Sequence, residues 1–189
     1  MEIQLAVQNY QAAMRLLDRE NLGRSPYWLC GEARLRGVVL RGLRGPEAEI
    51  QFYQERIKQL REMGFRDWGC GSDLYGRAAK VAREAGSLQL ALSFYQQGIK
   101  YFDEVDERQW KESRSWIIER KASLMFFLAD LGEQLGDQQK AAATFQDVME
   151  LTAGTNLSLY DVGPDYNGGH MKDNIFKLAA ERLRALKRH

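Results

Sequence analysis

The sequence predicts an all-α protein built from antiparallel helix pairs. Good helix formers (Gln, Glu, Arg, Ala and Leu) are plentiful, whereas β-branched residues seldom occur in runs. Only three prolines occur in 189 residues, which leaves room for long helices. Residues 75–102 place the small residues Ala79 and Ala82 before a Gly86-Ser87 break and Ala91 after it. Small side chains let two helices approach closely and the break lets the chain reverse, so this stretch predicts a helical hairpin.

The composition is that of an ordinary single-domain protein. Hydrophobic residues make up 44% of the chain and charged residues 28%, and this length suits one domain with a sizeable core. The net charge of +1 provides no field that would attract nucleic acid or a membrane surface. The sequence MEIQLAVQNY is not a signal peptide, and no apolar run approaches the ~20 residues of a membrane span. We therefore expect a cytoplasmic domain with neither a membrane nor a nucleic-acid partner.

The first helix, expected over residues 2–18, is interpreted as half of a hairpin. Its segment QLAVQNYQ (4–11) shares Gln, Leu, Ala, Tyr and the final Gln with QLALSFYQ (89–96), at an offset of 85 residues. The latter segment belongs to the second helix of the 75–102 hairpin. The first helix of the chain therefore resembles the second helix of a hairpin whose first helix is missing. We expect its apolar stripe to form a homodimer or to pack against the next hairpin.

The remaining elements follow from apolar periodicity and from breaks at glycine. A Gly-rich connection at 65–72 should tuck Phe65 and Trp68 against the hairpin ends, with Ser72 or Asp73 capping the next helix. Residues 155–171 are expected to be irregular. The predicted hairpins cover residues 26–63, 73–104 and 108–152, and a capping helix covers 172–187 of this single domain.

Two of the glycine breaks share a pattern of small and aromatic residues. Measured from Gly86 and Gly136, such residues lie at −7, −4, +5 and +9, whereas a frame centred on Gly45 fits less well. This spacing resembles that of the tetratricopeptide repeat, over roughly residues 2–153. The resemblance implies a right-handed stack of antiparallel αα-hairpins. The breaks lie 41 and 50 residues apart, against about 34 in the standard repeat, so longer helices are expected.

Three segments carry a narrower resemblance: QLAVQNYQAAMRLL, SPYWLCGEARLRGVVLRGLRG and ALSFYQQGIKYF. They are similar to the C-terminal helical part of an uncharacterised family of bacterial cytosolic proteins. That family usually carries a cysteine-rich, metal-binding segment before these helices, and this sequence contains none. The resemblance thus implies a fragment of a longer chain, and it implies architecture more than activity.

The concave face of such a stack, which is made by the first helices of the hairpins, is the predicted binding site. Its charges would orient an extended peptide and its apolar positions would hold side chains, which indicates a non-catalytic scaffold for a protein or peptide partner. The alternative is a solvated face on which Lys80 and Arg83 pair with Asp130 and Glu133 of the neighbouring repeat. The expected face residues are Glu32, Leu35, Val39, Asp73, Lys80, Arg83, Phe126, Asp130 and Glu133.

A second hypothesis places a small-ligand or metal-dependent enzyme or sensor around residues 160–173. Carboxylates and a histidine in a Gly-rich loop can bind metal or transfer protons, although a simple helix connection is the plainer interpretation. The loop lacks the alternating carboxylates of a calcium site, and no Gly-Lys-Ser/Thr follows Gly168-Gly169. The candidate residues are Asp161, Asp165, Tyr166, Asn167, His170 and Asp173.

The cysteines and the basic tail are given structural interpretations. Cys30, Cys70, His170 and His189 lack the local ligand pairs of structural zinc, so we expect no metal or cofactor, and both cysteines are expected as free buried thiols. Basic residues near the C-terminus suit the helix dipole and are expected to be solvated, without a role in nucleic-acid binding. They are Arg182, Arg184, Lys187 and Arg188.

Overall fold

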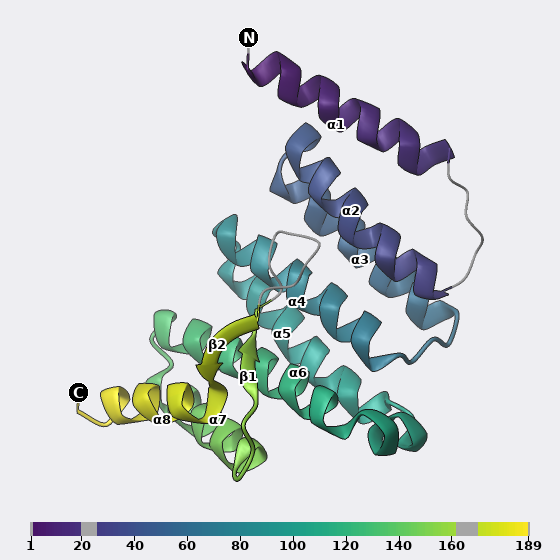
Figure 1. Cartoon of the computed structure of the whole chain (residues 1–189). Coiled ribbons are helices and arrows are strands. Elements are labelled where there is room, and N and C mark those ends of the chain that lie inside the picture. Colours follow the sequence, from purple (N-terminus) through teal and green to yellow (C-terminus); the bar gives the residue numbers. More distant parts are fainter. Residues whose placement is uncertain (1, 20–25, 162–169, 189) are drawn as a thin grey trace.

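The computed structural model of the chain describes residues 2–19, 26–161 and 170–188. This part is mostly helical, as predicted, and its helices are stacked in chain order with α1 and α8 at opposite ends (Figure 1). The elements are α1 (Glu2–Arg19), α2 (Pro26–Arg44), α3 (Pro46–Glu62), α4 (Trp68–Glu84), α5 (Leu88–Tyr101), the short 3-10 helix η1 (Phe102–Glu104), α6 (Glu107–Gln134), α7 (Gln138–Thr152), β1 (Ser158–Tyr160), β2 (His170–Asn174) and α8 (Ile175–Leu186).

Each helix from α1 to α8 packs against its neighbours in the chain, and α2, α4 and α6 also contact one another in turn. Glycine turns at Gly45, Gly86 and Gly136 join α2 to α3, α4 to α5 and α6 to α7. Their φ angles of 88°, 77° and 84° lie in the left-handed region, which glycine adopts without the steric cost of a Cβ. The predicted reversals of the chain therefore occur at the predicted glycines.

The turns at Gly86 and Gly136 have the same hydrogen bonds. The residue after each glycine donates its N–H to a carbonyl five residues earlier, Ser87 to Ala82 at 2.8 Å and Asp137 to Gly132 at 2.9 Å. This arrangement is a Schellman motif, which satisfies the last carbonyl groups of the helix. All eight small and aromatic positions around the two turns are buried: Ala79, Ala82, Ala91, Tyr95, Ala129, Gly132, Ala141 and Phe145.

Gly98 lets α5 fit closely between α4 and α6. A Cβ at this position would lie 2.8 Å from the Cβ of Tyr75 on α4 and 3.0 Å from the Cδ1 of Leu124 on α6. Both distances are shorter than an ordinary van der Waals contact. The absence of a side chain at residue 98 thus sets how closely the three helices approach.

The start of α4 differs from the prediction. The helix begins at Trp68, and the N-cap is Asp67 rather than Ser72 or Asp73, since the Asp67 carboxylate accepts a 2.7 Å hydrogen bond from the N–H of Cys70. The predicted Gly-rich connection is therefore helical from residue 68 onward. Gly71 suits this turn because the ring of Tyr101 occupies the space that a Cβ would need. Phe65 and Trp68 pack against the core, as expected.

The C-terminal region also departs from the prediction of an irregular 155–171 segment. Strands β1 and β2 pair in antiparallel fashion, with Ser158 opposite Asn174 and Tyr160 opposite His170. The last helix begins at Ile175 rather than 172, because the Asn174 side chain caps it by accepting from the N–H of Lys177. Apolar side chains of β1 and α8 form a second core with α6 and α7, which includes Leu159, Ile175, Ala179 and Leu183.

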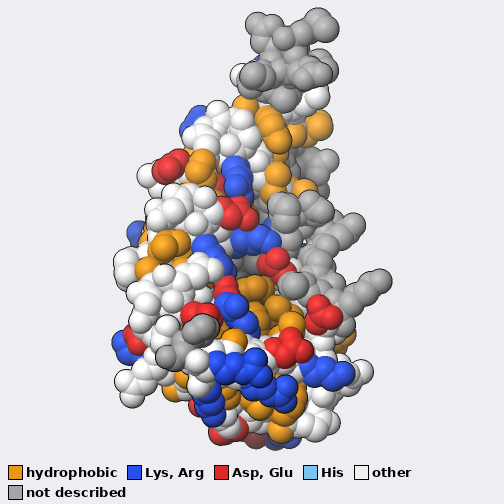
Figure 2. All heavy atoms as spheres, turned by 90° about the vertical axis from the view of Figure 1, so that its left-hand side faces the viewer, with side chains coloured by type: hydrophobic (Ala, Val, Ile, Leu, Met, Phe, Trp, Pro, Cys, Tyr) orange, Lys and Arg blue, Asp and Glu red, His pale blue; other side chains and the backbone are white. Residues whose placement is uncertain are grey.

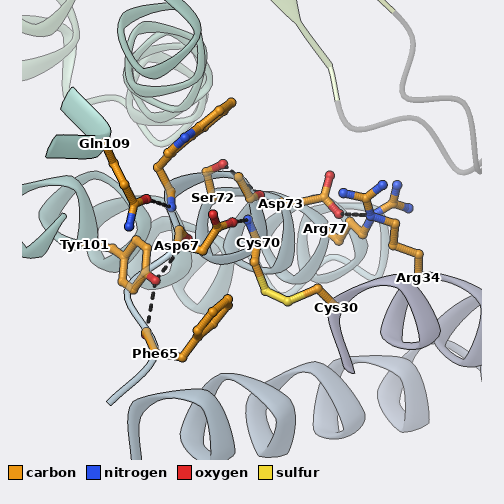
Figure 3. Close-up of a disulfide and its surroundings, with 12 residues drawn as sticks. Cys30, Arg34, Phe65, Asp67, Cys70, Ser72, Asp73, Arg77, Tyr101 and Gln109 are labelled. Atoms are coloured by element: carbon orange, nitrogen blue, oxygen red, sulfur yellow. Dashed lines mark hydrogen bonds and ion pairs between the residues drawn. A yellow bond between two sulfur atoms is a disulfide. The ribbon is translucent and has the colours of Figure 1, made fainter. Parts of the chain in front are cut away.

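Cys30 of α2 and Cys70 of α4 form a disulfide, so the prediction of free thiols was wrong (Figure 3). Their Cα atoms lie 5.6 Å apart, within the usual range for a disulfide. The two residues are 40 positions apart in the sequence and come together only because α2 packs on α4.

Helix α1 packs on α2, which is one of the two outcomes expected for it. The ring of Tyr10 lies where a Cβ of Gly42 would be, and Asp18 accepts a 2.6 Å hydrogen bond from Arg36 of α2. Leu16 remains exposed. The homodimer through this helix stays a prediction.

We predict that a Cys30→Ser, Cys70→Ser variant loses about 4 kcal/mol of unfolding free energy relative to the oxidised protein, because the disulfide restricts a loop of about 40 residues in the unfolded chain. Urea unfolding with and without reductant measures this difference. Reductant should destabilise the wild type and leave the variant unchanged. Equal stabilities of the oxidised wild type and the variant would contradict the prediction.

We predict that Gly98→Ala destabilises the fold by about 1–3 kcal/mol, because the new methyl group collides with Tyr75 and Leu124. Gly31→Ala is the matched control, since a Cβ at residue 31 meets no atom within 4 Å. The control should stabilise helix α2 by about 0.5–1 kcal/mol. Thermal or urea unfolding of both variants measures the contrast, and a Gly98→Ala protein as stable as Gly31→Ala would disprove it.

Candidate functional site

The candidate site is the side of the stack on which α2, α4 and α6 carry a series of ion pairs. We call it the α2–α4–α6 face and define it by Arg34, Asp73, Arg77, Lys80, Arg83, Arg120 and Asp130. Acidic and basic side chains alternate along one side of the molecule, with apolar side chains beside them (Figure 2). The face thus offers both charged and apolar contacts.

Asp73 is the centre of this face, and it is 1% exposed. Its Oδ2 accepts hydrogen bonds from the Nε of Arg34 at 2.7 Å and from the Nε of Arg77 at 2.9 Å. The Nη1 of Arg120 lies 3.9 Å from the other oxygen, Oδ1. One carboxylate on α4 therefore attracts guanidinium groups from α2 and α6 as well as from its own helix.

Helix geometry explains how these groups come together. Asp73 and Arg77 are four residues apart and so lie on one side of α4. Arg34 follows Cys30 by one turn of α2, and Asp73 follows Cys70 by about one turn of α4. The disulfide and the Arg34–Asp73 ion pair consequently join α2 to α4 at two points, one turn apart (Figure 3).

Further along the face, the predicted charges pair across helices. Arg83 of α4 donates to Asp130 of α6 at 2.6 Å, and Lys80 pairs with Asp161 at 2.8 Å. Arg182 of α8 reaches both Asp130 and Glu133, the latter at 3.0 Å. The alternative interpretation, in which these charges pair with one another, is thus observed for Arg83 and Asp130. Arg182 pairs with α6 and is not simply solvated.

Strand β1 lies on the face in an extended conformation. The Arg120 guanidinium lies 3.0 Å from the centroid of the Tyr160 ring. The N–H of Tyr160 donates to the Ser123 hydroxyl at 2.8 Å, and that hydroxyl donates to the Glu119 carbonyl at 2.7 Å. With the Lys80–Asp161 pair, these contacts hold an extended segment by its backbone, an aromatic ring and an acidic group.

The structure separates some of the predicted site residues from the rest. Glu32 is buried and pairs with Arg36 and Arg56 at 2.6 and 3.2 Å, and Val39 is also buried. Phe126 belongs to the second core, where its ring centroid lies 5.3 Å from that of Phe145. The side chains of Glu32, Val39 and Phe126 therefore lie inside the fold and are not exposed on the α2–α4–α6 face.

Leu35, in contrast, is 44% exposed. Leu35 lies two residues before Gly37, so the two positions are about 200° apart around the axis of α2. Gly37 faces Tyr53 of α3. Leu35 therefore points away from α3, toward the side that carries the α2–α4–α6 face. Together with Asp73, Lys80, Arg83, Asp130 and Glu133, it is a predicted residue that the structure places on or beside this face.

The predicted face residues did not include Arg34, Arg77 or Arg120, and Tyr160 was expected only in the alternative site around residues 160–173. The four-residue spacing of Asp73 and Arg77 was a visible signal, since such pairs interact on a helix. No local signal joins Arg34 or Arg120 to Asp73, because these contacts require α2, α4 and α6 to be adjacent. Burial is the main cause that lowers the pKa of Arg120, although Tyr160 and Asp73 act in the opposite direction.

A groove of about 470 Å³ separates α5 from α7, with α6 at its floor. Leu92 of α5, Leu128 and Leu135 of α6 and Ala141 of α7 line it, and Gln89, Gln96, Lys140 and Thr144 add polar groups. Unlike the α2–α4–α6 face, this groove contains one charged pair, Asp137 and Lys140, at its edge.

The candidate residues of the 160–173 loop fall into two groups. Asp165, Tyr166 and Asn167 lie outside the described residues, as does His189, whereas Asp161 pairs with Lys80 and Asp173 is exposed. In the ranges 2–19, 26–161 and 170–188, no three His, Cys, Asp or Glu residues are grouped to hold a metal ion. Cys30 and Cys70 are joined to each other and so are not available as ligands in this state.

No family model, curated protein or solved structure matches this chain. The fold and the face define a protein of stacked helices that carries ion pairs along one face. Within the described residues, no helix is long and apolar enough to cross a membrane.

We predict that Asp73→Asn lowers the free energy of unfolding by about 3–5 kcal/mol, because it leaves buried guanidinium groups without their shared carboxylate. Asp103→Asn is the matched control: its side chain is 67% exposed and pairs with Lys121. The control should cost less than about 1 kcal/mol. Chemical unfolding measures both values, and equal losses would contradict a central role for Asp73.

Proposed function

We propose that this protein is a non-catalytic scaffold that binds an extended segment of a protein partner on the α2–α4–α6 face. We further propose that the helices form a right-handed, tetratricopeptide-like stack in which this face is concave. The observation that carries the proposal is strand β1, because an extended segment of the chain itself already lies on this face. Ser123 and Arg120 hold the strand at Tyr160, and Lys80 pairs with Asp161, which directly follows the strand.

The packing of the helices supports a concave face. Helices α2, α4 and α6 contact one another in turn, whereas a groove separates α5 from α7. A stack whose layers lie closer together on one side than on the other curves toward the closer side. An extended partner would therefore contact several helices at once.

The chemistry of the face suits a peptide with both apolar and charged side chains. Leu35 is an exposed apolar contact, and the side chains of Arg34, Lys80 and Arg83 are 30%, 24% and 26% exposed. Partly exposed charges contribute mainly to orientation and specificity, whereas apolar anchors contribute most of the affinity. Leu35 is thus the side chain whose loss should weaken binding most.

The alternative, a small-ligand or metal-dependent site around residues 160–173, remains a prediction. The cavity beside Tyr160 has room for about one water molecule, and Tyr160 itself covers Arg120. No observation on the described residues favours this alternative. Elemental analysis of the purified protein would reveal a bound metal.

The cytoplasmic location also remains a prediction. The Cys30–Cys70 disulfide is an argument against it, because reducing compartments keep most thiols free. Thiol labelling of the protein inside cells, before lysis, would determine which state is present. Free thiols in an otherwise folded protein would agree with the cytoplasm.

We predict that Leu35→Asp weakens binding of peptides selected on the wild-type protein at least tenfold, because it places a charge on the apolar contact of the face. Peptides enriched from a random display library serve as probes, and fluorescence anisotropy gives their Kd. Leu135→Asp is the matched control, since Leu135 is also an exposed leucine but lines the groove between α5 and α7.

The two variants separate the face from the groove. Peptides that lose affinity for Leu35→Asp and keep it for Leu135→Asp support the proposal. Loss with Leu135→Asp alone would move the site to the groove. A selection that enriches no peptide would count against a peptide-binding function.

A further inference from the structure

The contact between α2 and α4 is held by a disulfide and by ion pairs. The Cys30–Cys70 disulfide is the covalent link, and one turn further along the Nε of Arg34 lies 2.7 Å from Oδ2 of Asp73. A disulfide forms or breaks with the redox state of its surroundings, whereas an ion pair between Arg and Asp does not. The α2–α4 contact is therefore the part of the stack that oxidation and reduction can change.

The other links hold α2 less firmly than the disulfide does. Arg41 of α2 donates to Glu84 of α4 at 2.7 Å, but their side chains are 39% and 40% exposed, and such surface pairs contribute little to stability. The Arg34 side chain is 30% exposed, and Asp73 also accepts a 2.9 Å hydrogen bond from Arg77 of its own helix. Reduction thus leaves α2 attached to α4 by pairs in which the α2 side chain is partly exposed.

The disulfide lies next to the open part of the α2–α4–α6 face. Arg34 follows Cys30 by one turn of α2, and Leu35, which is 44% exposed, follows Arg34 directly. A displacement of α2 moves both side chains relative to α4 and α6. A partner segment that contacts several helices must then order them, and this ordering lowers its affinity.

The two sulfur atoms are shielded, but they lie beside an uncovered stretch of α2. Cys30 and Cys70 are 7% and 5% exposed, whereas thiol–disulfide exchange requires a thiolate to reach one of the two sulfurs. The residue after Cys30 is Gly31, and a Cβ at this position would meet no atom within 4 Å. We therefore expect a local displacement of α2 to be enough to expose the sulfur of Cys30.

We propose that Cys30 and Cys70 form a reversible thiol–disulfide switch, in which the disulfide form of the α2–α4–α6 face binds its partner segment more tightly than the dithiol form. The switch rests on the proposed function for its partner.

The reductant of this switch is a dithiol. One of its thiolates attacks a cysteine sulfur, which breaks the Cys30–Cys70 bond and forms a mixed disulfide with that cysteine. The second thiolate of the reductant then attacks the reductant sulfur of the mixed disulfide and releases the cysteine. The protein gains two electrons and two protons and carries two thiols, and the reductant becomes a disulfide.

A purely structural disulfide is the competing interpretation. Such a disulfide stabilises the protein by restricting the unfolded chain, and its loss leaves the geometry of the folded protein unchanged. The two interpretations therefore differ in the affinity of the folded protein and not in its stability.

The main test measures the Kd of selected peptides for the oxidised protein and for the protein reduced with dithiothreitol, by fluorescence anisotropy. Peptides are selected both on the oxidised wild type and on a Cys30→Ser, Cys70→Ser variant, so that the selection favours neither state. We expect the reduced protein to bind about three- to tenfold more weakly, because α2 must be ordered on binding. The variant should bind like the reduced protein, with and without dithiothreitol.

Amide hydrogen exchange determines whether α2 is the element that moves. Reduction should speed exchange in α2 and leave exchange in α8 unchanged, because α8 packs in the second core, which does not include the disulfide. Helix α8 is thus a matched control within the same molecule. Circular dichroism under the same conditions measures whether the reduced protein is folded.

Three results would overturn the switch. Equal Kd values in the two states would identify a structural disulfide. A reduced protein that is unfolded would do the same, because a switch requires two folded states. Thiols that appear during reduction only as fast as the whole protein unfolds would also exclude it, because the disulfide would then not be reached in the folded protein.

The switch and the proposed function can fail separately. Peptides that bind both states equally would exclude the switch and leave the scaffold function intact. If neither selection enriches a peptide, the scaffold function fails, whereas a rise in exchange on reduction that is confined to α2 would retain the redox-controlled displacement of this helix.

Discussion

The ion-pair cluster around the Asp73 carboxylate is the interaction on which the arrangement of the helices depends most. A buried carboxylate is costly unless charged donors surround it, and here the donors come from α2, α4 and α6. This requirement restricts how the three helices can slide along one another, because a shift of one turn would remove Arg34 or Arg120 from Asp73. Apolar packing alone tolerates such shifts more readily, since it is not directional.

Two further constraints act with this cluster. The Cys30–Cys70 disulfide fixes α2 to α4 one turn away from the Arg34–Asp73 pair. The missing side chain of Gly98 lets α5 approach Tyr75 of α4 and Leu124 of α6 at distances that an alanine would forbid. Polar, covalent and steric constraints therefore fix the same group of helices.

Strand β1 both stabilises the C-terminal core and contacts the α2–α4–α6 face. It closes the C-terminal core through Leu159, and it presents Tyr160 to Arg120. The same face thus stabilises the fold and displays the contacts that an extended segment makes. A partner on this face would use the part that β1 leaves open, near Leu35 and Arg34, which are partly exposed. The proposals rest on the geometry of this face.

Local signals in the sequence determined the helices and the places where the chain reverses. Gly86 and Gly136 were recognisable because a left-handed turn favours glycine, and Ala79, Ala82 and Ala91 because close helix packing favours small residues. Sequence reasoning placed the start of α4 five residues too late, because Gly69 and Gly71 resemble a loop until Tyr101 is seen to fill the space beside Gly71. It also missed β1 and β2, which are too short for periodicity to reveal.

Only the tertiary structure decided the contents of the candidate site. Asp73, Lys80, Arg83, Asp130 and Glu133 take part in ion pairs, but of these five only Arg83 and Asp130 pair with each other. Glu32, Val39 and Phe126 are buried elsewhere. The disulfide, the Arg34–Asp73 pair and the Arg120–Tyr160 contact each join residues about 40 positions apart. A sequence specifies which residues share a turn of one helix, because that spacing is fixed by the backbone. Which turns of different helices face one another depends on how all the side chains pack together, and that is settled only when the chain has folded.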